Sequence, residues 1–252
     1  MMRIISRLDI KSNNLIKGIR FEGLRKLGDP DSFAVRYYNA GIDEILLMDT
    51  VASLYGRNQL SSLIESVAKK IFVPLTIGGG IRTFEDAQHL FNLGADKVAI
   101  NSASFSNLEL IGKIASQYGS QAVVGSIETI WRGQDWECMY EQGRERSGVF
   151  LEKRINSLVD MGVGEILVTS VDLDGTQKGF DLKLAEVASS ISPVPVVVGG
   201  GCGTLEDIIA ISKIRELSAI AIGSAFHFDN ISVRDAKNAT LSTPVQEERR
   251  ID

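Results

Sequence analysis

The chain has 252 residues, a hydrophobic content of 44% and a formal net charge of −5. This length suits one large domain or two small ones and supplies ample apolar material for a core. The acidic balance and the scattered Lys and Arg residues, with no basic run among aromatic residues, argue against a nucleic-acid partner.

Short apolar runs alternate along the chain with amphipathic stretches, a pattern typical of a parallel sheet with helices between its strands. The predicted strands are Arg3–Asp9, Glu44–Asp49, Val73–Gly78, Lys97–Asn101, Ala122–Glu128, Glu165–Ser170, Val194–Gly199 and Ala219–Gly223. The predicted helices are Asp31–Ala40, Gln59–Lys70, Thr83–Leu93, Asn107–Tyr118, Gly148–Met161, Asp181–Ser190 and Thr204–Ile214. Eight strand–helix units of this size predict a (β/α)8 TIM barrel, with a doubly wound sheet as the alternative.

An internal repeat favours the barrel. Val73–Gly80 reads VPLTIGGG and Val194–Gly201 reads VPVVVGGG. Shortly after each copy, Thr83 and Thr204 stand three residues before an aspartate, which predicts matching helix N-caps of the capping-box type. We therefore expect a barrel built from two similar half-barrels.

No linker or change of composition divides the chain, so we expect a single barrel domain over residues 1–240. Residues 241–252 form a polar C-terminal tail that is expected to fray. Two connections, Lys11–Gly28 and Thr129–Ser147, are longer than a barrel needs. We expect them to be loops that can act as lids.

The repeated glycine runs point to phosphate binding. Without side chains, backbone N–H groups can close around an anion where a strand leads into a helix, and two such places suggest a ligand with a phosphate at each end. A tight strand–helix turn is the alternative explanation for each run alone. The binding candidates at the carboxyl ends of the strands are Asp49, Gly80, Asn101, Ser102, Thr169, Asp174, Gly175, Gly200, Gly201, Gly223 and Ser224.

Two carboxylates stand out among the strand ends. Asp9 ends the first predicted strand and Glu128 the fifth, and these strands face each other across a barrel. Carboxylates on opposite sides of one pocket can serve as general acid and general base, although each could also merely cap a loop. The histidines, His89 and His227, are poorly placed for a metal or a catalytic triad, and aromatic residues are few. We therefore expect no metal and no organic cofactor.

Charged residues begin four of the predicted strands, at the opposite mouth of the barrel. They are Arg3, Glu44, Lys97 and Glu165. They can form a ring of ion pairs that gates a channel, or simply a solvated face that stabilises the barrel.

Cysteine usage and hydropathy bear on the compartment. Cys138 and Cys202 are far apart and are expected to be free thiols in a reducing environment. The N-terminus lacks the apolar length of a signal peptide, and no window approaches the roughly 20 apolar residues of a membrane span. We expect a cytoplasmic protein with no membrane partner.

The chain resembles HisF, the cyclase subunit family of imidazole glycerol phosphate synthase, from about Arg3 to Phe228. The strings that carry the resemblance are Lys17–Gly18, Gly28–Pro30, Asp43–Glu44, Gly78–Ile81, Gly94–Val98, Gly119–Gln121, Gly164–Leu167, Asp174–Thr176 and Phe226–Phe228. The resemblance implies a lyase of histidine biosynthesis. Ammonia from a HisH-like glutaminase, the partner in a heterodimer, would attack a bisphosphorylated ribulosyl aminoimidazole carboxamide nucleotide and yield imidazole glycerol phosphate and aminoimidazole carboxamide ribotide.

The resemblance also implies residue roles. Asp9 matches the first catalytic aspartate and Lys17 the loop lysine of the family. Asp96 matches the aspartate that faces the glutaminase. The phosphate sites fall on the glycines and small polar residues named above, and the four charged residues match the gate at the ammonia entrance.

Three residues depart from the family pattern. Glu128 replaces the second catalytic aspartate, Arg7 a small residue, and Gln142 a serine. The extra methylene of Glu128 displaces the carboxylate by about 1 Å, which matters where catalytic geometry is tight. Two alternatives therefore stay open: a HisF-like paralogue that channels ammonia for amidation of a surface sugar, and a non-catalytic scaffold that binds a glutaminase.

Overall fold

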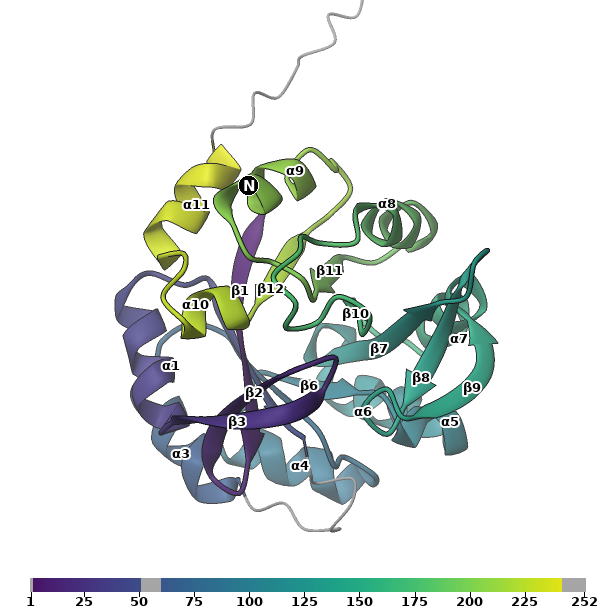
Figure 1. The fold of residues 1–252 in the computed structure, drawn as a ribbon. Helices are drawn as coiled ribbons and strands as arrows, with labels where there is room; N and C mark the ends of the chain where they lie inside the picture. Colours follow the sequence, from purple (N-terminus) through teal and green to yellow (C-terminus); the bar gives the residue numbers. More distant parts are fainter. Residues whose placement is uncertain (1, 51–59, 242–252) are drawn as a thin grey trace, which may run out of the picture.

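The computed structural model describes residues 2–50 and 60–241. Eight parallel strands close into a ring in this part of the chain, because β7 pairs with β10 at the open ends of the order β10–β11–β12–β1–β4–β5–β6–β7. Figure 1 shows the helices arranged around these strands. The fold is therefore the predicted TIM barrel, and the doubly wound alternative is excluded.

The barrel strands lie close to the predicted segments. They are β1 (Arg3–Lys11), β4 (Glu44–Asp49), β5 (Leu75–Gly78), β6 (Lys97–Ile100), β7 (Val123–Trp131), β10 (Glu165–Ser170), β11 (Val196–Gly199) and β12 (Ala219–Ile222). The predicted tail falls almost wholly on residues 242–252, which lie outside the described residues, as does Gln59 at the predicted start of the second helix.

The helices between the strands are α1 (Pro30–Asn39), α3 (Ser61–Ala68), α4 (Phe84–Asn92), α6 (Glu109–Tyr118), α7 (Leu151–Asp160), α8 (Leu182–Ile191) and α9 (Leu205–Ile211). Elements that we did not predict are α5 (Ala103–Ser106), α10 (Ser224–His227), α11 (Val233–Leu241) and the 3-10 turn η1 (Ser120–Ala122). The predicted caps are confirmed: Thr83 and Thr204 each form a capping box with the aspartate three residues on.

The prediction of two long loops is wrong. Lys11–Gly28 contains β2 (Asn14–Ile19) and β3 (Glu22–Gly28). Thr129–Ser147 contains β8 (Trp136–Tyr140) and the start of β9 (Glu145–Phe150). Strands β1 and β7 run past the barrel rim and fold back as antiparallel ribbons, both visible in Figure 1. Because β9 continues to Phe150, α7 begins at Leu151 and not at Gly148.

The barrel lumen is apolar in its middle. Alternate residues of a strand point to opposite faces, so Ile4 and Leu8 pack toward the helices while Ile5 points inward. The inward cluster is Ile5, Leu46, Ala99, Val124, Leu167, Val197, Ala219 and Ala221. Ion pairs lie at both ends of this cluster.

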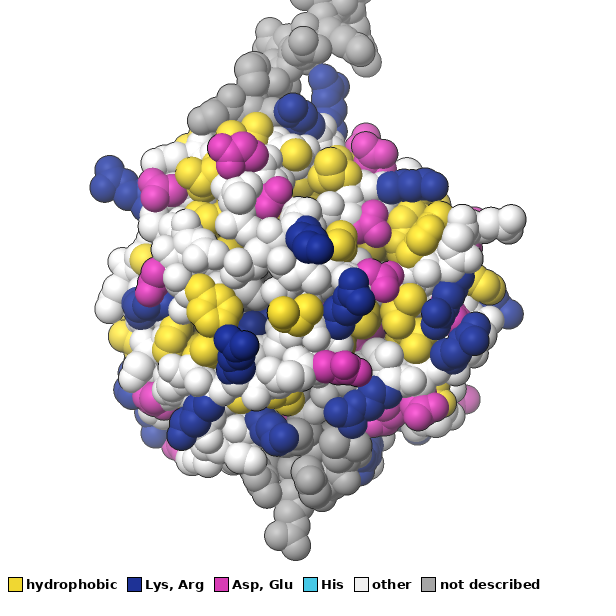
Figure 2. Space-filling model, in the orientation of Figure 1, with side chains coloured by type: hydrophobic (Ala, Val, Ile, Leu, Met, Phe, Trp, Pro, Cys, Tyr) yellow, Lys and Arg dark blue, Asp and Glu magenta, His cyan; other side chains and the backbone are white. Residues whose placement is uncertain are grey.

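Charges of both signs are mixed on one face of the molecule. Figure 2 shows positive and negative side chains interspersed on the side drawn in Figure 1. Among the described helices, none is long and apolar enough to cross a membrane.

Candidate functional site

A cavity of about 250 Å³ opens at the carboxyl ends of the barrel strands. Of the predicted site residues, those around it are Asp9, Lys17, Asp49, Gly80, Asn101, Ser102, Glu128 and Asp174. The barrel therefore brings together groups from β1, β4, β7 and the segments that follow β5, β6 and β10. The hairpin β2–β3 adds Lys17 and the ring of Phe21.

Lys17 lies at the centre of a buried ion network. Its Nζ atom lies 2.9 Å from Oδ2 of Asp9 and 2.8 Å from Oδ2 of Asp174, and all three side chains are almost fully buried. Strand β2 pairs with β1 so that Asp9 lies opposite Ile16, next to Lys17. The hairpin that we took for a loop is thus what carries Lys17 into the site.

Arg7 is a second buried cation in the same network. Its Nε donates to Oδ1 of Asp9 at 2.8 Å, and Nη1 donates to the hydroxyl of Thr169 at 3.0 Å. The guanidinium thereby connects β1 with β10, and it lies 5.5 Å from the ring centre of Phe21. His227 also contacts β1, because its Nε2 lies 3.0 Å from the carbonyl oxygen of Arg7.

The two cations decide the charge state of Asp9. Burial alone would raise the pKa of Asp9, but the positive charges of Arg7 and Lys17 outweigh burial and hold that pKa well below its ordinary value. Burial likewise opposes the charge of Lys17, yet Asp174 and Asp9 raise its pKa. The network therefore pairs the two cations with the carboxylates of Asp9 and Asp174.

Glu128 lies in a different environment within the same cavity. Its Oε2 accepts a 2.8 Å hydrogen bond from the backbone N–H of Gly143, in the turn between β8 and β9. Burial raises the pKa of Glu128 to about 7, against the opposing effects of Arg7 and of this hydrogen bond. A carboxyl with this pKa can both give and accept a proton near neutrality.

The first glycine run and its neighbours form one side of the large cavity. Gly79 and Gly80 have φ values of 94° and 71°, which only glycine adopts readily. The hydroxyl of Ser102 accepts from the N–H of Glu141 at 3.0 Å, and Asn101 donates to the carbonyl of Met139. These two bonds attach the β8–β9 ribbon to this side of the site.

The second glycine run lines a separate small cavity of about 10 Å³. The predicted residues around it are Gly175, Gly200, Gly201, Gly223 and Ser224. Arg7, Lys17 and Asp174 line both cavities, so the ion network separates the two glycine-lined sites. Thr169 lines neither cavity: it is fully buried, and its hydroxyl accepts from Arg7.

Asp174 is placed differently from the expectation of a phosphate-binding turn. Its carboxylate pairs with Lys17, and its N–H already donates to Ser170 within the turn. The Thr176 hydroxyl donates to the carbonyl of Leu173 at 2.7 Å. Gly175 allows the turn to lie against the hairpin, since a Cβ there would lie 2.1 Å from the carbonyl oxygen of Gly18.

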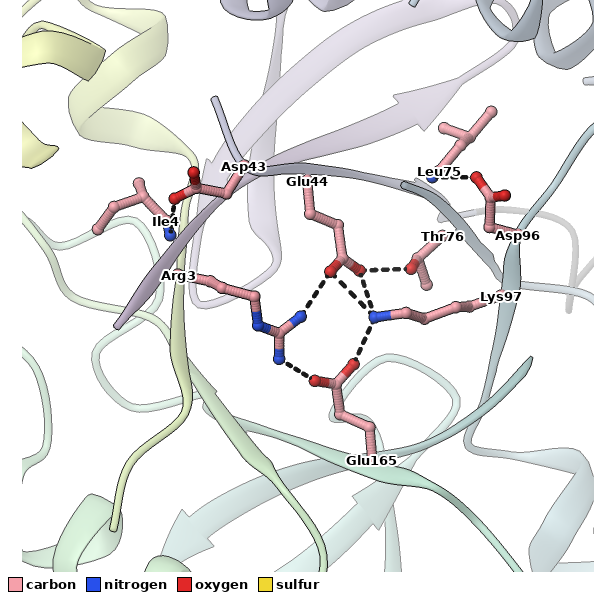
Figure 3. A network of polar contacts seen from close by, with 9 residues as sticks. All are labelled: Arg3, Ile4, Asp43, Glu44, Leu75, Thr76, Asp96, Lys97 and Glu165. Atoms are coloured by element: carbon pink, nitrogen blue, oxygen red, sulfur yellow. Dashed lines mark hydrogen bonds and ion pairs between the residues drawn. The ribbon is translucent and has the colours of Figure 1, made fainter. Parts of the chain in front are cut away.

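At the opposite mouth, Arg3, Glu44, Lys97 and Glu165 form a closed ring of ion pairs (Figure 3). Nζ of Lys97 lies 3.0 Å from Glu44 and 2.9 Å from Glu165, and Arg3 pairs with the same two carboxylates. Thr76 donates to Glu44 from β5. The ring closes the lumen below the apolar cluster.

Asp96 lies beside this ring but is not part of it. The residue is exposed, and its Oδ2 accepts a 2.8 Å hydrogen bond from the N–H of Leu75 (Figure 3). The carboxylate thus lies at the outer surface of the barrel bottom.

Sequence reasoning missed several residues of the cavity. Arg7 entered only as a departure from a family pattern, and Phe21, Glu141 and Gln142 were not proposed as site residues. The signal for Arg7 was present: it lies two residues before Asp9, so both side chains point to the same side of β1.

Cys138 lines neither cavity, whereas Cys202 lines the small cavity beside the second glycine run. Both thiols are free, as expected, and both are buried, which raises the pKa of Cys138 to about 12. Within residues 2–50 and 60–241 no group of three or more His, Cys, Asp or Glu side chains could hold a metal ion.

Comparisons with known proteins point in one direction. The family model described as histidine biosynthesis protein matches residues 3–232. An imidazole glycerol phosphate synthase subunit HisF from Legionella pneumophila is 50% identical over 208 residues, which are 82% of this chain and 98% of that protein. Proteins of the same name from Pyrococcus furiosus and Bacillus cereus are 41% and 38% identical, and the matches cover 93% and 97% of both chains, respectively.

Proposed function

Because this chain belongs to the HisF family of histidine biosynthesis proteins, we propose that it is the cyclase subunit of an imidazole glycerol phosphate synthase. In the proposed reaction, ammonia attacks a bisphosphorylated ribulosyl aminoimidazole carboxamide nucleotide. The products are imidazole glycerol phosphate and aminoimidazole carboxamide ribotide.

The observation that carries this proposal is the arrangement of the cavity at the carboxyl ends of the barrel strands. Asp9, Lys17 and Glu128 line the cavity that holds the first glycine run, and Lys17 also lines the small cavity beside the second run. A substrate with a phosphate at each end can place one phosphate at Gly80, Asn101 and Ser102 and the other at the second glycine run. The part between the phosphates then lies against the carboxylates, where proton transfer is needed.

The opposite end of the barrel suggests how ammonia arrives. The ring of Arg3, Glu44, Lys97 and Glu165 lies at one end of an apolar lumen, and the cavity lies at the other. Ammonia is small and neutral, so it can cross an apolar lumen that excludes ions. We propose that a HisH-like glutaminase docks at this mouth, near Asp96, in a heterodimer that delivers ammonia through the ring.

The proposal places the protein in the cytoplasm. Free, buried thiols at Cys138 and Cys202 suit a reducing compartment.

Product formation from an ammonium salt tests the function. The purified chain, given the ribulosyl nucleotide and ammonium and no glutaminase, should release both products. Substrate that binds without turnover would remove the cyclase proposal and leave the two alternatives, a conduit for sugar amidation and a glutaminase-binding scaffold. Loss of substrate binding as well would favour the scaffold, which has no use for two phosphate sites.

A further inference from the structure

The two facing carboxylates of the cavity are not equivalent. Both are buried, with exposed fractions of 4% for Asp9 and 6% for Glu128. They differ in the groups that contact them. Each oxygen of Asp9 accepts a hydrogen bond from a cation, Oδ1 from Arg7 and Oδ2 from Lys17. Both oxygens of Asp9 therefore lie against a positive charge, which disfavours the protonated form of this carboxyl.

Glu128 accepts its hydrogen bond from a backbone N–H, that of Gly143, through Oε2. The charged groups that face it are Arg7 and Asp9 from β1 and Asp174 from the turn after β10. The other charged residues that line the same cavity are Lys17, Asp49, Arg82 and Glu141.

The charges in this cluster balance without Glu128. Arg7 and Lys17 are matched by Asp9 and Asp174, so an ionised Glu128 adds an unmatched negative charge to a buried site. Burial is the main cause of the raised pKa of Glu128, and the negative charges of Asp9 and Asp174 add to it, while Arg7 and the Gly143 hydrogen bond oppose it.

We infer that Arg7 makes the two carboxylates unequal: with Lys17 it holds Asp9 as a permanent anion, and it leaves Glu128 as the carboxyl that exchanges protons with the substrate. The inference rests on the proposed function and deepens it. Arg7 acts here as a positioning residue, and Asp9 acts as a fixed negative charge that can stabilise positive charge on the substrate.

The proton count of the proposed reaction fits one exchanging group. When ammonia adds to a ketone and water leaves, the nitrogen loses two protons in turn and the former carbonyl oxygen gains two, one to form the carbinolamine and one to leave as water. A single carboxyl can accept each proton from nitrogen and pass it to the oxygen, so that Glu128 ends both transfers in its starting state. No other reactant is required.

The pH dependence of ammonium-driven kcat, measured with free ammonia held constant, tests the inference. The wild-type profile should have a limb with a midpoint near 7, as expected from the pKa of Glu128. Glu128→Gln should remove that limb and lower kcat by about 10²–10⁴-fold, the usual contribution of general acid–base catalysis. Asp9→Asn should lower kcat and keep the limb. A limb that survives in Glu128→Gln, or disappears in Asp9→Asn, would overturn the inference.

The role of Arg7 is tested by the midpoint of the same limb of the kcat–pH profile. The positive charge of Arg7 lowers the pKa of Glu128, so Arg7→Met should move the midpoint upward. Arg7→Lys keeps the charge and should bring the midpoint back toward the wild-type value. If Arg7 were only structural, Arg7→Met would lower kcat without moving the midpoint.

Titration of the resting protein separates this inference from the proposed function. In a chain with ¹³C-labelled glutamate carboxyls, NMR should show one carboxyl that titrates near pH 7, is absent from Glu128→Gln and moves upward in Arg7→Met. Glu137→Gln, which removes another buried glutamate paired with Arg132 and Arg146, should leave that signal in place. A chain that forms no product but shows this titration contradicts the function only. A chain without any glutamate that titrates above pH 6 contradicts the inference.

Discussion

Glu44 and Lys97 pair across an intervening strand. They begin β4 and β6, which are separated by β5 in the barrel, yet Oε2 of Glu44 lies 3.0 Å from Nζ of Lys97. Thr76 on β5 donates to the same carboxylate at 2.7 Å. The contact therefore connects three consecutive strands at the bottom of the barrel, and Arg3 and Glu165 extend it into a ring.

Glu44→Gln should destabilise the barrel. The change leaves Arg3 and Lys97 with one carboxylate between them, and Glu44 itself is only 3% exposed. We expect a loss of about 2–3 kcal/mol in the free energy of unfolding, which is less than that of a fully buried pair because the two cations reach solvent. Urea unfolding at neutral pH measures it.

The matched control is Lys69→Met. Lys69 pairs with Glu65 on the surface of α3, where both side chains are more than half exposed. Such a pair should contribute nothing measurable. Equal effects of the two substitutions would show that the ring is no more than a solvated face.

Glu128 should make stability fall as the pH rises. The pKa of Glu128 is about 7 in the native state, against an ordinary value of 4.5 in the unfolded chain. Between these two pH values the native state therefore binds a proton that the unfolded chain has lost. Its contribution is fully present below pH 4.5 and is lost as the pH rises through about 7, a change of about 3 kcal/mol.

Glu128→Gln should remove this pH dependence. Urea unfolding of both proteins from pH 4.5 to 8 gives the difference between them, in which other titrating groups cancel. The variant should gain stability relative to the wild type as the pH rises. A difference that stays constant with pH would show that Glu128 is an ordinary carboxylate.

Gly201→Ala should disturb the second glycine-lined site. Gly201 has a φ of 100°, and a Cβ there would lie 1.9 Å from the carbonyl oxygen of Gly179, so the backbone must move. We expect a loss of about 3 kcal/mol, of which about 1 comes from the left-handed conformation alone. The KM of the bisphosphorylated substrate should also rise.

Gly133→Ala is the control for conformation. Gly133 has a φ of 87°, and a Cβ there would have nothing within 4 Å. This variant should lose only about 1 kcal/mol and keep its KM. Equal losses in the two alanine variants would exclude a close contact between the second glycine run and the Gly179 turn.

Most of the fold could be predicted from sequence patterns that lie within single segments. Glu165–Ser170 was predicted at its observed bounds because a strand buried on both faces is a continuous apolar run. The caps at Thr83 and Thr204 followed from spacing within one turn. The same reasoning failed for the β2–β3 and β8–β9 ribbons, whose polar, exposed outer strands lack the apolar alternation that marks a half-buried strand.

Side-chain pairings between distant segments could not be predicted from the sequence. The order of the barrel strands brought Asp9, Glu128 and the two glycine runs to one face, as expected from their positions at strand ends. The partner of Lys17 across 157 positions, Asp174, depends on how a hairpin folds over the rim. The role of Arg7 depends equally on contacts with Thr169 on β10.

The most direct test of the account is the ammonium-driven rate of Asp9→Asn. The variant keeps the shape of the side chain and removes the charge that faces Arg7 and Lys17. Product formation should fall by about 100-fold or more, while substrate affinity and circular dichroism stay close to the wild type. A folded Asp9→Asn variant that forms product at the full rate would show that the charge of Asp9 plays no part in the reaction.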